Sequence, residues 1–195
     1  MINIESEIAK LKQSGTFKER TLQPLSFGTY DECKSLIKDI FIAVDKTINK
    51  FQFLPEYDKV AKYLSNTEGK GLHLHGDCGR GKTLILTYVM PILFKSINKH
   101  ISSFNSLELH KNIESLESCK NITVEDVGLE TISKTYGNEL DIFSYLCEKY
   151  ENNNGLLLFS TNLNLKAIHL RYGDRTIDRI SKLCYSIEFK GKSLR

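Results

Sequence analysis

Apolar residues recur at helical spacing through the first third of the chain. Residues 31–49 carry apolar side chains three to four positions apart, a period that predicts an amphipathic helix. The same spacing occurs earlier, in residues 4–11, and a third predicted helix starts just after Pro55 and ends near Ser65. This first third is therefore expected to be all helical.

From residue 70 onward, short apolar runs alternate with amphipathic stretches. The expected strands are residues 70–76, 101–104, 121–125, 155–161 and 184–189. The expected helices between them are residues 82–96, with a kink at Pro91, 105–118, 139–150, and one or two helices in 165–182. The run "GLLLFST" is almost wholly apolar, which is typical of a strand covered on both faces. The alternation predicts an open, mostly parallel α/β fold with flanking helices.

Composition limits the number of domains and the compartment. The chain has 195 residues, 41% of them hydrophobic and 26% charged, which is enough for one α/β core and at most a small second module. Its five cysteines form no C-x-x-C pair, a usage that suits a reducing cytoplasm and argues against a zinc site. The N-terminus lacks an apolar signal core, and no apolar stretch is long enough to cross a bilayer. We expect a cytoplasmic protein without a membrane partner.

The sequence "GDCGRGKT" fits the phosphate-binding pattern G-x-x-x-x-G-K-[ST] without departure. It lies between an expected strand and an expected helix, so backbone N–H groups and the helix N-terminus would converge on the phosphates of a nucleotide. In this pattern the lysine reaches the β- and γ-phosphates and the threonine hydroxyl ligates Mg²⁺. The expected nucleotide-binding residues are Gly76, Asp77, Cys78, Gly79, Arg80, Gly81, Lys82 and Thr83.

Two further strand ends carry polar groups. Glu125 and Asp126 end the third strand, and with Thr83 they are the candidate Mg²⁺ ligands. Their order reverses the usual aspartate-then-glutamate, so we expect support of the ion from both and action on the attacking water from Asp126. Glu130 is an alternative base. Asn162 follows the fourth strand, where it could contact the water or the γ-phosphate.

Arginines recur in "RYGDRTIDRI", in which Arg175 and Arg179 would share a helix face. Unpaired like charges at this spacing repel each other. Two explanations stay open: ion pairs with Asp174 and Asp178, or a phosphate met by an arginine finger from a neighbouring subunit. Residues 166–195 hold eight Lys and Arg against three Asp and Glu, which indicates either a solvated basic tail or an anion-binding surface.

A phosphate loop alone does not name a reaction. A GTPase would need a guanine-reading N-K-x-D element, which is absent from the sequence. A small-molecule kinase would usually carry an arginine-rich lid; none is clear, although the basic C-terminal region leaves this alternative open.

Together, "GKGLHLHGDCGRGKT", "VEDVG", "STNLN", "YGDRTIDRI" and "FKGKSLR" resemble the AAA+ ATPases of the bacterial helicase-loader group. This group includes the DnaC-type replication loaders and the IstB-type transposition helpers, and the resemblance covers residues 52–195. It implies a helical N-terminal extension in residues 1–50, a candidate partner-binding segment, and an AAA+ P-loop ATPase domain in residues 51–195. No C-terminal lid domain is expected.

The resemblance also implies the chemistry and the partners. Lys82 and Thr83 would hold the phosphates and Mg²⁺ of ATP, and Asn162 would be the first sensor. Arg179 matches the arginine finger, with Arg175 as its companion, in a homo-oligomer that places nucleotide at subunit interfaces. The expected function is slow, oligomer- or DNA-dependent ATP hydrolysis coupled to a replicative helicase and single-stranded DNA. The alternatives are a transposase partner and a nucleotide-gated scaffold with little hydrolysis.

Overall fold

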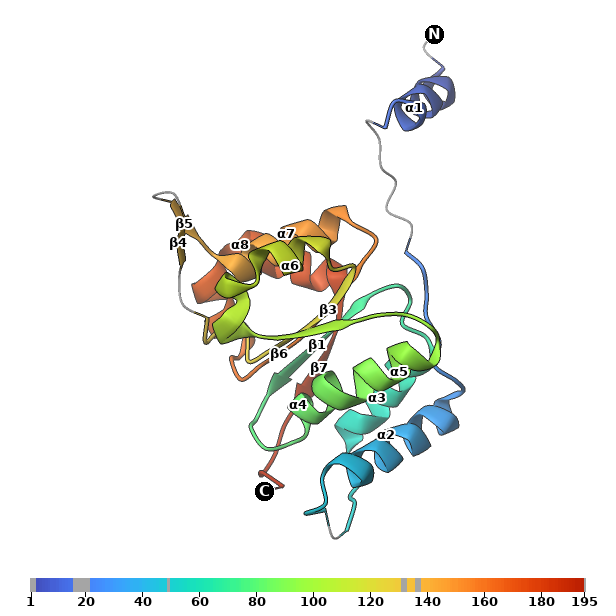
Figure 1. The fold of residues 1–195 in the computed structure, drawn as a ribbon, viewed down its shortest axis with the longest axis vertical. Coiled ribbons are helices and arrows are strands. Elements are labelled where there is room, and N and C mark those ends of the chain that lie inside the picture. Colours follow the sequence, from blue (N-terminus) through green and yellow to red (C-terminus); the bar gives the residue numbers. More distant parts are fainter. Residues whose placement is uncertain (1–2, 16–21, 49, 131–132, 136–137, 195) are drawn as a thin grey trace.

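Five parallel strands form the central sheet. The computed structural model describes residues 3–15, 22–48, 50–130, 133–135 and 138–194 (Figure 1). The strands are β1 (Gly71–Gly76), β2 (Ser102–Asn105), β3 (Asn121–Glu125), β6 (Leu156–Thr161) and β7 (Cys184–Phe189). Their order in the sheet is β2-β3-β6-β1-β7, and every neighbouring pair is parallel. The predicted α/β class and all five predicted strands are confirmed.

Helices cover both faces of this sheet (Figure 1). On one face lie α2 (Tyr30–Val44), α3 (Pro55–Ser65), α4 (Lys82–Leu84) and α5 (Met90–Ser96). On the other lie α6 (Ile113–Ser118), α7 (Ile142–Asn152) and α8 (Leu165–Leu183). Successive strand residues feed the two cores in turn, so Leu157 packs with α7 and α8 while Leu158 packs with α2 and α3. This double coverage explains why every residue of β6 is buried.

The N-terminal helices differ in how they pack. α2 begins with a capping box in which Thr29 and Glu32 satisfy each other's backbone N–H groups, and it buries Cys33, Ile37 and Phe41 in the core. α1 (Ile4–Gln13) has no buried residue, and its apolar side chains are exposed. Within the expected extension of residues 1–50, α2 is therefore part of the core that covers the sheet, whereas α1 presents an unpacked apolar stripe.

Two predicted helices are interrupted. Between α4 and α5, residues Ile85–Val89 form a π-helical turn, placed just before Pro91, which has no N–H to donate to an α-helical bond. The predicted helix 105–118 divides into a 3₁₀ helix (Ser106–Lys111) and α6. Both interruptions preserve the direction of the chain between strands.

Two other departures lie in the second half of the chain. α8 is one predicted segment bent at Gly173, whose φ of 78° is non-helical. β4 (Ser133–Thr135) and β5 (Asn138–Leu140) form an antiparallel pair that the sequence analysis did not predict.

Among the described helices, none is both long and apolar enough to cross a lipid bilayer.

Candidate nucleotide-binding site

A cavity of about 850 Å³ opens at the carboxyl ends of β1, β3 and β6. This is the edge of an open α/β sheet at which ligands generally bind. Its walls are the glycine-rich loop before α4, the connection between α2 and α3, and the strand ends. The lining residues that matter below are Ile48, Phe51, Tyr57, Lys82, Thr83, Asp126, Asn162 and Leu194.

The glycine-rich loop adopts a conformation that side chains would prevent. Gly76 has a φ of 111°, and a Cβ there would lie 2.2 Å from the backbone oxygen of Phe189. Gly81, with a φ of 86°, would bring a Cβ to 2.7 Å from the Tyr57 hydroxyl. Both positions therefore require glycine. The loop can keep its backbone N–H groups turned toward an anion, as a phosphate cradle needs.

Lys82 begins α4 and is almost buried, with 6% of its surface exposed. Its Nζ donates to the backbone oxygens of Gly76 and Asp77, at 2.8 and 2.7 Å. Burial lowers the pKa of Lys82, while the carboxylates of Asp126 and Asp77 act in the opposite direction. These contacts hold the ammonium group at the mouth of the loop, where it can move to a phosphate oxygen.

The acidic pair is divided between two environments. Asp126 lines the cavity together with Lys82, whereas the Glu125 carboxylate accepts a hydrogen bond from Thr87 in the π-helical turn. The Asp126 backbone is held on both sides: its N–H donates to Ser160 Oγ at 3.3 Å, and its oxygen accepts from Ser106 Oγ at 2.7 Å. Its φ of 53° is unusual for an aspartate and turns the chain sharply at the strand end. Asp126 is the acid of the pair that lines the cavity.

Glu130 does not belong to this site. Its carboxylate accepts hydrogen bonds from the Gly128 N–H at 2.7 Å and from the Tyr172 hydroxyl, and Arg171 Nη2 donates to its backbone oxygen at 2.6 Å. Glu130 is buried among these partners and does not line the cavity. The alternative in which it serves as the base is therefore wrong.

Asn162 lies where the sequence analysis expected it. β6 is hydrogen-bonded to β1, with Thr161 opposite His75, so Asn162 follows the strand beside the phosphate loop. The Thr161 hydroxyl donates to the Val127 backbone oxygen at 2.6 Å, which ties this strand end to the end of β3. Asn162 lines the cavity and is exposed to it.

The other end of the cavity is aromatic. Phe41, Phe51 and Tyr57 line it, and the rings of Phe51 and Tyr57 stack with centroids 6.0 Å apart. Phe27, Phe53 and Tyr57 are the aromatic residues that the sequence suggests for stacking on a base; Tyr57 lines the cavity, Phe53 does not, and Phe27 packs against Phe94 elsewhere. Phe41 and Phe51 were missed. For Phe51 the available signal was the cluster "FQFLPEY" shortly before the phosphate-loop strand.

The arginines of α8 have different surroundings. Arg179 is half-buried, and it contacts Glu151 at 2.8 Å and Glu148 at 3.3 Å, both on α7. Asp178 pairs instead with Lys182, at 2.6 Å, and Asp174 contacts His169, so among the described residues neither aspartate forms the expected pair with Arg175 or Arg179. For Arg175, which is exposed, no hydrogen bond or ion pair is found within the described residues. Arg175 is therefore free to meet a group outside this chain.

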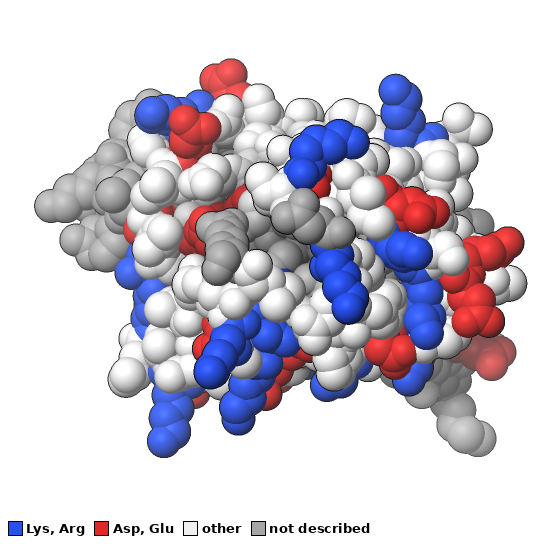
Figure 2. Space-filling model, turned by 90° about the horizontal axis from the view of Figure 1, so that it is seen from below, with Lys and Arg blue, Asp and Glu red and all other residues white. Residues whose placement is uncertain are grey.

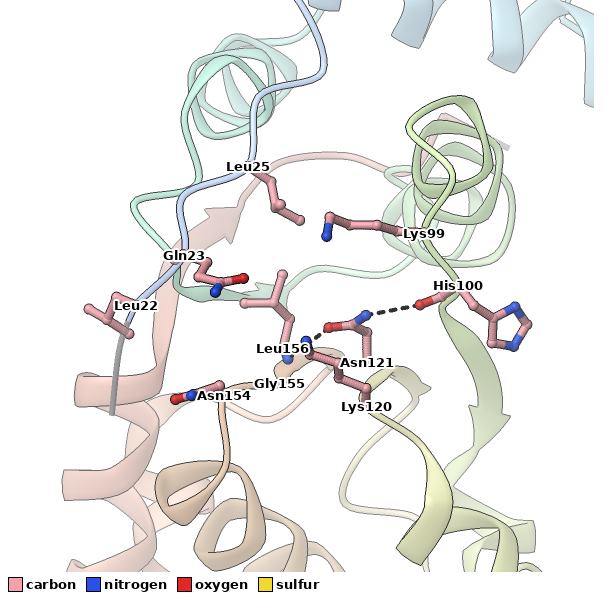
Figure 3. Close-up of a pocket in the computed structure, with 11 residues that line it drawn as sticks. Leu22, Gln23, Leu25, Lys99, His100, Lys120, Asn121, Asn154, Gly155 and Leu156 are labelled. Carbon is pink, nitrogen blue, oxygen red and sulfur yellow. Dashed lines mark hydrogen bonds between the residues drawn. The ribbon is translucent and has the colours of Figure 1, made fainter. Parts of the chain in front are cut away.

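A second cavity, of about 200 Å³, lies at the opposite edge of the sheet (Figure 3). There the Asn121 side chain donates to the His100 backbone oxygen at 2.9 Å and accepts from the Leu156 N–H at 3.2 Å. Lys99 and Lys120 also line it. It contains no residue of the glycine-rich loop and is much the smaller, so the first cavity is the candidate nucleotide site.

Comparison with known proteins bears on the fold. No protein-family model matches the sequence, and no curated protein matches it. A solved structure of DnaI has a TM-score of 0.57 at 19% sequence identity, over 78% of this chain and 94% of that one. A solved structure of the DnaC helicase loader has a TM-score of 0.54 at 16% identity, over 72% and 94%. The chain therefore shares the fold of these proteins, and the resemblance inferred from its motifs is confirmed at the level of the fold.

Proposed function

We propose that this protein binds ATP and hydrolyses it slowly, and that it couples the nucleotide to the engagement of a replicative helicase and single-stranded DNA. The observation that carries the proposal is a complete phosphate loop facing Asp126 and Asn162, in a fold shared with DnaI and the DnaC helicase loader. The glycine-rich motif supports a nucleotide as the ligand, and the fold shared with DnaI and the DnaC helicase loader supports a helicase as the partner.

The cavity suits a magnesium nucleotide. Lys82 and the loop amides face the phosphates, the Thr83 hydroxyl and the Asp126 carboxylate offer the oxygen ligands that Mg²⁺ prefers, and aromatic rings line the far end. When bound, Mg²⁺ would neutralise charge on the β- and γ-phosphates. Glu125 does not line the cavity, because its carboxylate accepts a hydrogen bond from Thr87 in the π-helical turn.

Slow hydrolysis follows from the division of the two acids. Asp126 and Asn162 both line the cavity, and in this proposal Asp126 accepts a proton from a water there while Asn162 orients that water or the γ-phosphate. A second carboxylate in the cavity would strengthen both tasks, but Glu125 is engaged by Thr87. The same observation favours the second candidate function, a nucleotide-gated scaffold that turns over little ATP.

Partners are proposed from surfaces that the chain leaves uncovered. The apolar stripe of α1 suits a protein partner such as a helicase, and Arg175 suits the nucleotide of an adjacent subunit. DNA contact rests on the basic excess of residues 166–195. Figure 2 shows Lys and Arg interspersed with Asp and Glu on one face, without a single continuous basic patch there.

The test is a pull-down with purified protein in the presence and absence of ATP, scored for a helicase or a transposase. We expect ATP-dependent capture of a helicase by the wild type and none by Lys82→Ala. Capture of a transposase instead would replace the loader function by transposition help. Transfer of phosphate to a metabolite, with no protein captured, would favour a small-molecule kinase.

A further inference from the structure

The C-terminal end of the chain returns to the phosphate loop. Figure 1 shows this red end beside the green loop that precedes α4. Three hydrogen bonds join the two segments: Gly191 N–H to Asp77 Oδ2 at 2.7 Å, Leu194 N–H to the Gly79 oxygen at 3.0 Å, and Arg80 Nη1 to the Lys192 oxygen at 3.0 Å. We call residues 191–194 the strap.

The contact is close enough to constrain both segments. A Cβ at Gly79 would lie 2.1 Å from Ser193 Oγ, and a Cβ at Gly191 would lie 2.8 Å from Arg80 Nη1. Gly79 belongs to the phosphate loop, so the strap touches the segment that must hold its shape around the phosphates. Any shift of the loop on binding nucleotide is therefore transmitted to the strap.

The side chains that hold the strap occupy positions that the phosphate-loop motif leaves variable. G-x-x-x-x-G-K-[ST] leaves residues 77–80 unspecified, yet Asp77 and Arg80 both bind the strap. Arg80 is buried and also pairs with Glu56 of α3, its Nε lying 2.6 Å from Glu56 Oε1. Since α3 also carries Tyr57 of the aromatic end, α3, the loop and the strap form one connected wall.

Leu194 completes that wall. It lines the same cavity as Lys82 and Phe51, yet half of its surface remains exposed. The loop amides and Lys82 take the phosphates, so an apolar side chain on the wall is left for the apolar surface of the nucleoside. A bound nucleotide would cover the surface that Leu194 now exposes.

We propose that the strap is part of the nucleotide site, with Leu194 packing on the nucleoside and Asp77 and Arg80 acting as positioning residues that hold it there. This inference rests on the proposed function, since it takes the ligand to be a nucleoside triphosphate. It adds binding residues beyond the phosphate-loop motif and makes the position of the strap depend on nucleotide.

The first test measures the affinity of a fluorescent N-methylanthraniloyl ATP with Mg²⁺. Leu194→Ala should weaken binding about fivefold, because it removes a partly buried leucine contact. Asp77→Ala should weaken it by a similar factor, and the double variant by no more than the larger single effect, because both changes disable one unit. Leu170→Ala, which truncates an exposed leucine of α8, is the matched control and should bind as the wild type.

A second measurement separates binding from folding. Without nucleotide, Leu194→Ala should unfold at the wild-type temperature; the stabilisation by the ATP analogue should be smaller, because weaker binding stabilises less. Trypsin cleavage after Lys192 should slow when the analogue binds the wild type, and should be faster in Asp77→Ala.

The outcomes are distinguishable. If the wild type fails to bind the analogue, or Lys82→Ala binds as well as the wild type, the proposed function fails. If the wild type binds and Lys82→Ala does not, but Leu194→Ala and Asp77→Ala match the wild type, only the strap is overturned. Unchanged cleavage after Lys192 on binding also overturns it.

Discussion

Thr87 donates a hydrogen bond to the carboxylate of Glu125, and this contact separates the two acids at the end of β3. Thr87 lies in the π-helical turn Ile85–Val89, where the wider turn alters which side chains face the sheet. Glu125 consequently meets the helix, while Asp126, the next residue, lines the nucleotide cavity. The reversed order of the acids thus has a structural counterpart: the longer side chain reaches the helix and the shorter one lines the cavity.

The two acids should therefore respond differently to neutralisation. Asp126→Asn should lower ATP hydrolysis by roughly 10²-fold or more while ATP binding is retained, because a cavity group that accepts a proton is lost. Glu125→Gln should lower it less than Asp126→Asn, because Glu125 does not line the cavity. Phosphate release and nucleotide affinity, measured on both variants, check this. Equal losses in the two would contradict the assignment of Asp126 as the acid that acts on water.

Removing the Thr87 hydroxyl should destabilise the fold, because the Glu125 carboxylate loses a hydrogen-bond donor. Thr87→Val keeps the shape of the side chain but leaves the half-buried Glu125 carboxylate without this donor, at a cost of about 1–3 kcal/mol in the free energy of unfolding. Thr87→Ser retains a donor at this position and is the matched control. Denaturant unfolding of both variants gives the measurement. A valine variant as stable as the serine one would show that the bond contributes nothing.

Regular elements of this fold were predictable because they repeat a simple pattern. β6 is buried on both faces, so its sequence "LLLFST" opens with four apolar residues in a row, and the predicted strand, residues 155–161, differs from the observed one by a single residue. The phosphate loop was predictable because its glycines are fixed by close backbone contacts, such as that between Gly76 and Phe189. Structural features that have local causes of this kind can therefore be predicted from sequence patterns.

Side-chain positions that depend on contacts between distant segments show no such pattern in the sequence. Glu130 looked like an alternative base by its distance along the chain from Asp126, yet Tyr172, more than forty positions away, holds its carboxylate outside the cavity. Likewise Phe41 lines the cavity from α2, although it appeared as one member of a helical core stripe. The strands β4 and β5, three residues each, are too short to show a period at all.

His73 should make the stability of the protein depend on pH. Its ring is fully buried in β1 and stacks on Phe159; Nδ1 lies 3.0 Å from Ser186 Oγ, and no partner is found for Nε2 within the described residues. Burial, assisted by the neighbouring His75, lowers the pKa of His73 to about 3. An unfolded chain would bind a proton at this side chain near pH 6.5, so stability should fall as pH decreases from about 6.5 toward 3, by up to about 1.4 kcal/mol per pH unit.

His73→Phe should make this decline less steep, because phenylalanine keeps a ring beside Phe159 and takes up no proton. The decline should not vanish, because burial also lowers the pKa of His75. Denaturant midpoints of the variant and the wild type, measured between about pH 7 and pH 4, give the slope of stability against pH. The two proteins should differ within this range. His110→Gln, a change at an exposed histidine outside the sheet, is the control. Parallel curves for His73→Phe and the wild type would contradict the prediction.

Alanine variants of Arg175 and Arg179 should show whether each arginine acts on an adjacent subunit or only within its own chain. Arg179 bridges to Glu148 and Glu151 on α7, so Arg179→Ala should lower the free energy of unfolding slightly, because solvent weakens a partly exposed ion pair. Arg175 has no such contact within the described residues, and Arg175→Ala should leave stability unchanged. If either arginine reaches the nucleotide of an adjacent subunit, its loss should spare ATP binding and lower hydrolysis in the assembled protein.

The decisive experiment mixes each arginine variant with Asp126→Asn, which keeps its own arginines but is expected to lose hydrolysis. In a mixed assembly, Asp126→Asn would supply an intact arginine to a neighbour whose cavity is intact. We expect hydrolysis to recover above that of either variant alone when the arginine acts between subunits, and to stay low when it acts only within its own chain. Recovery with Arg179→Ala would mean that the contacts with Glu148 and Glu151 open on assembly. Recovery with Arg175→Ala alone would identify Arg175 as the finger and leave Arg179 as the bridge between α7 and α8.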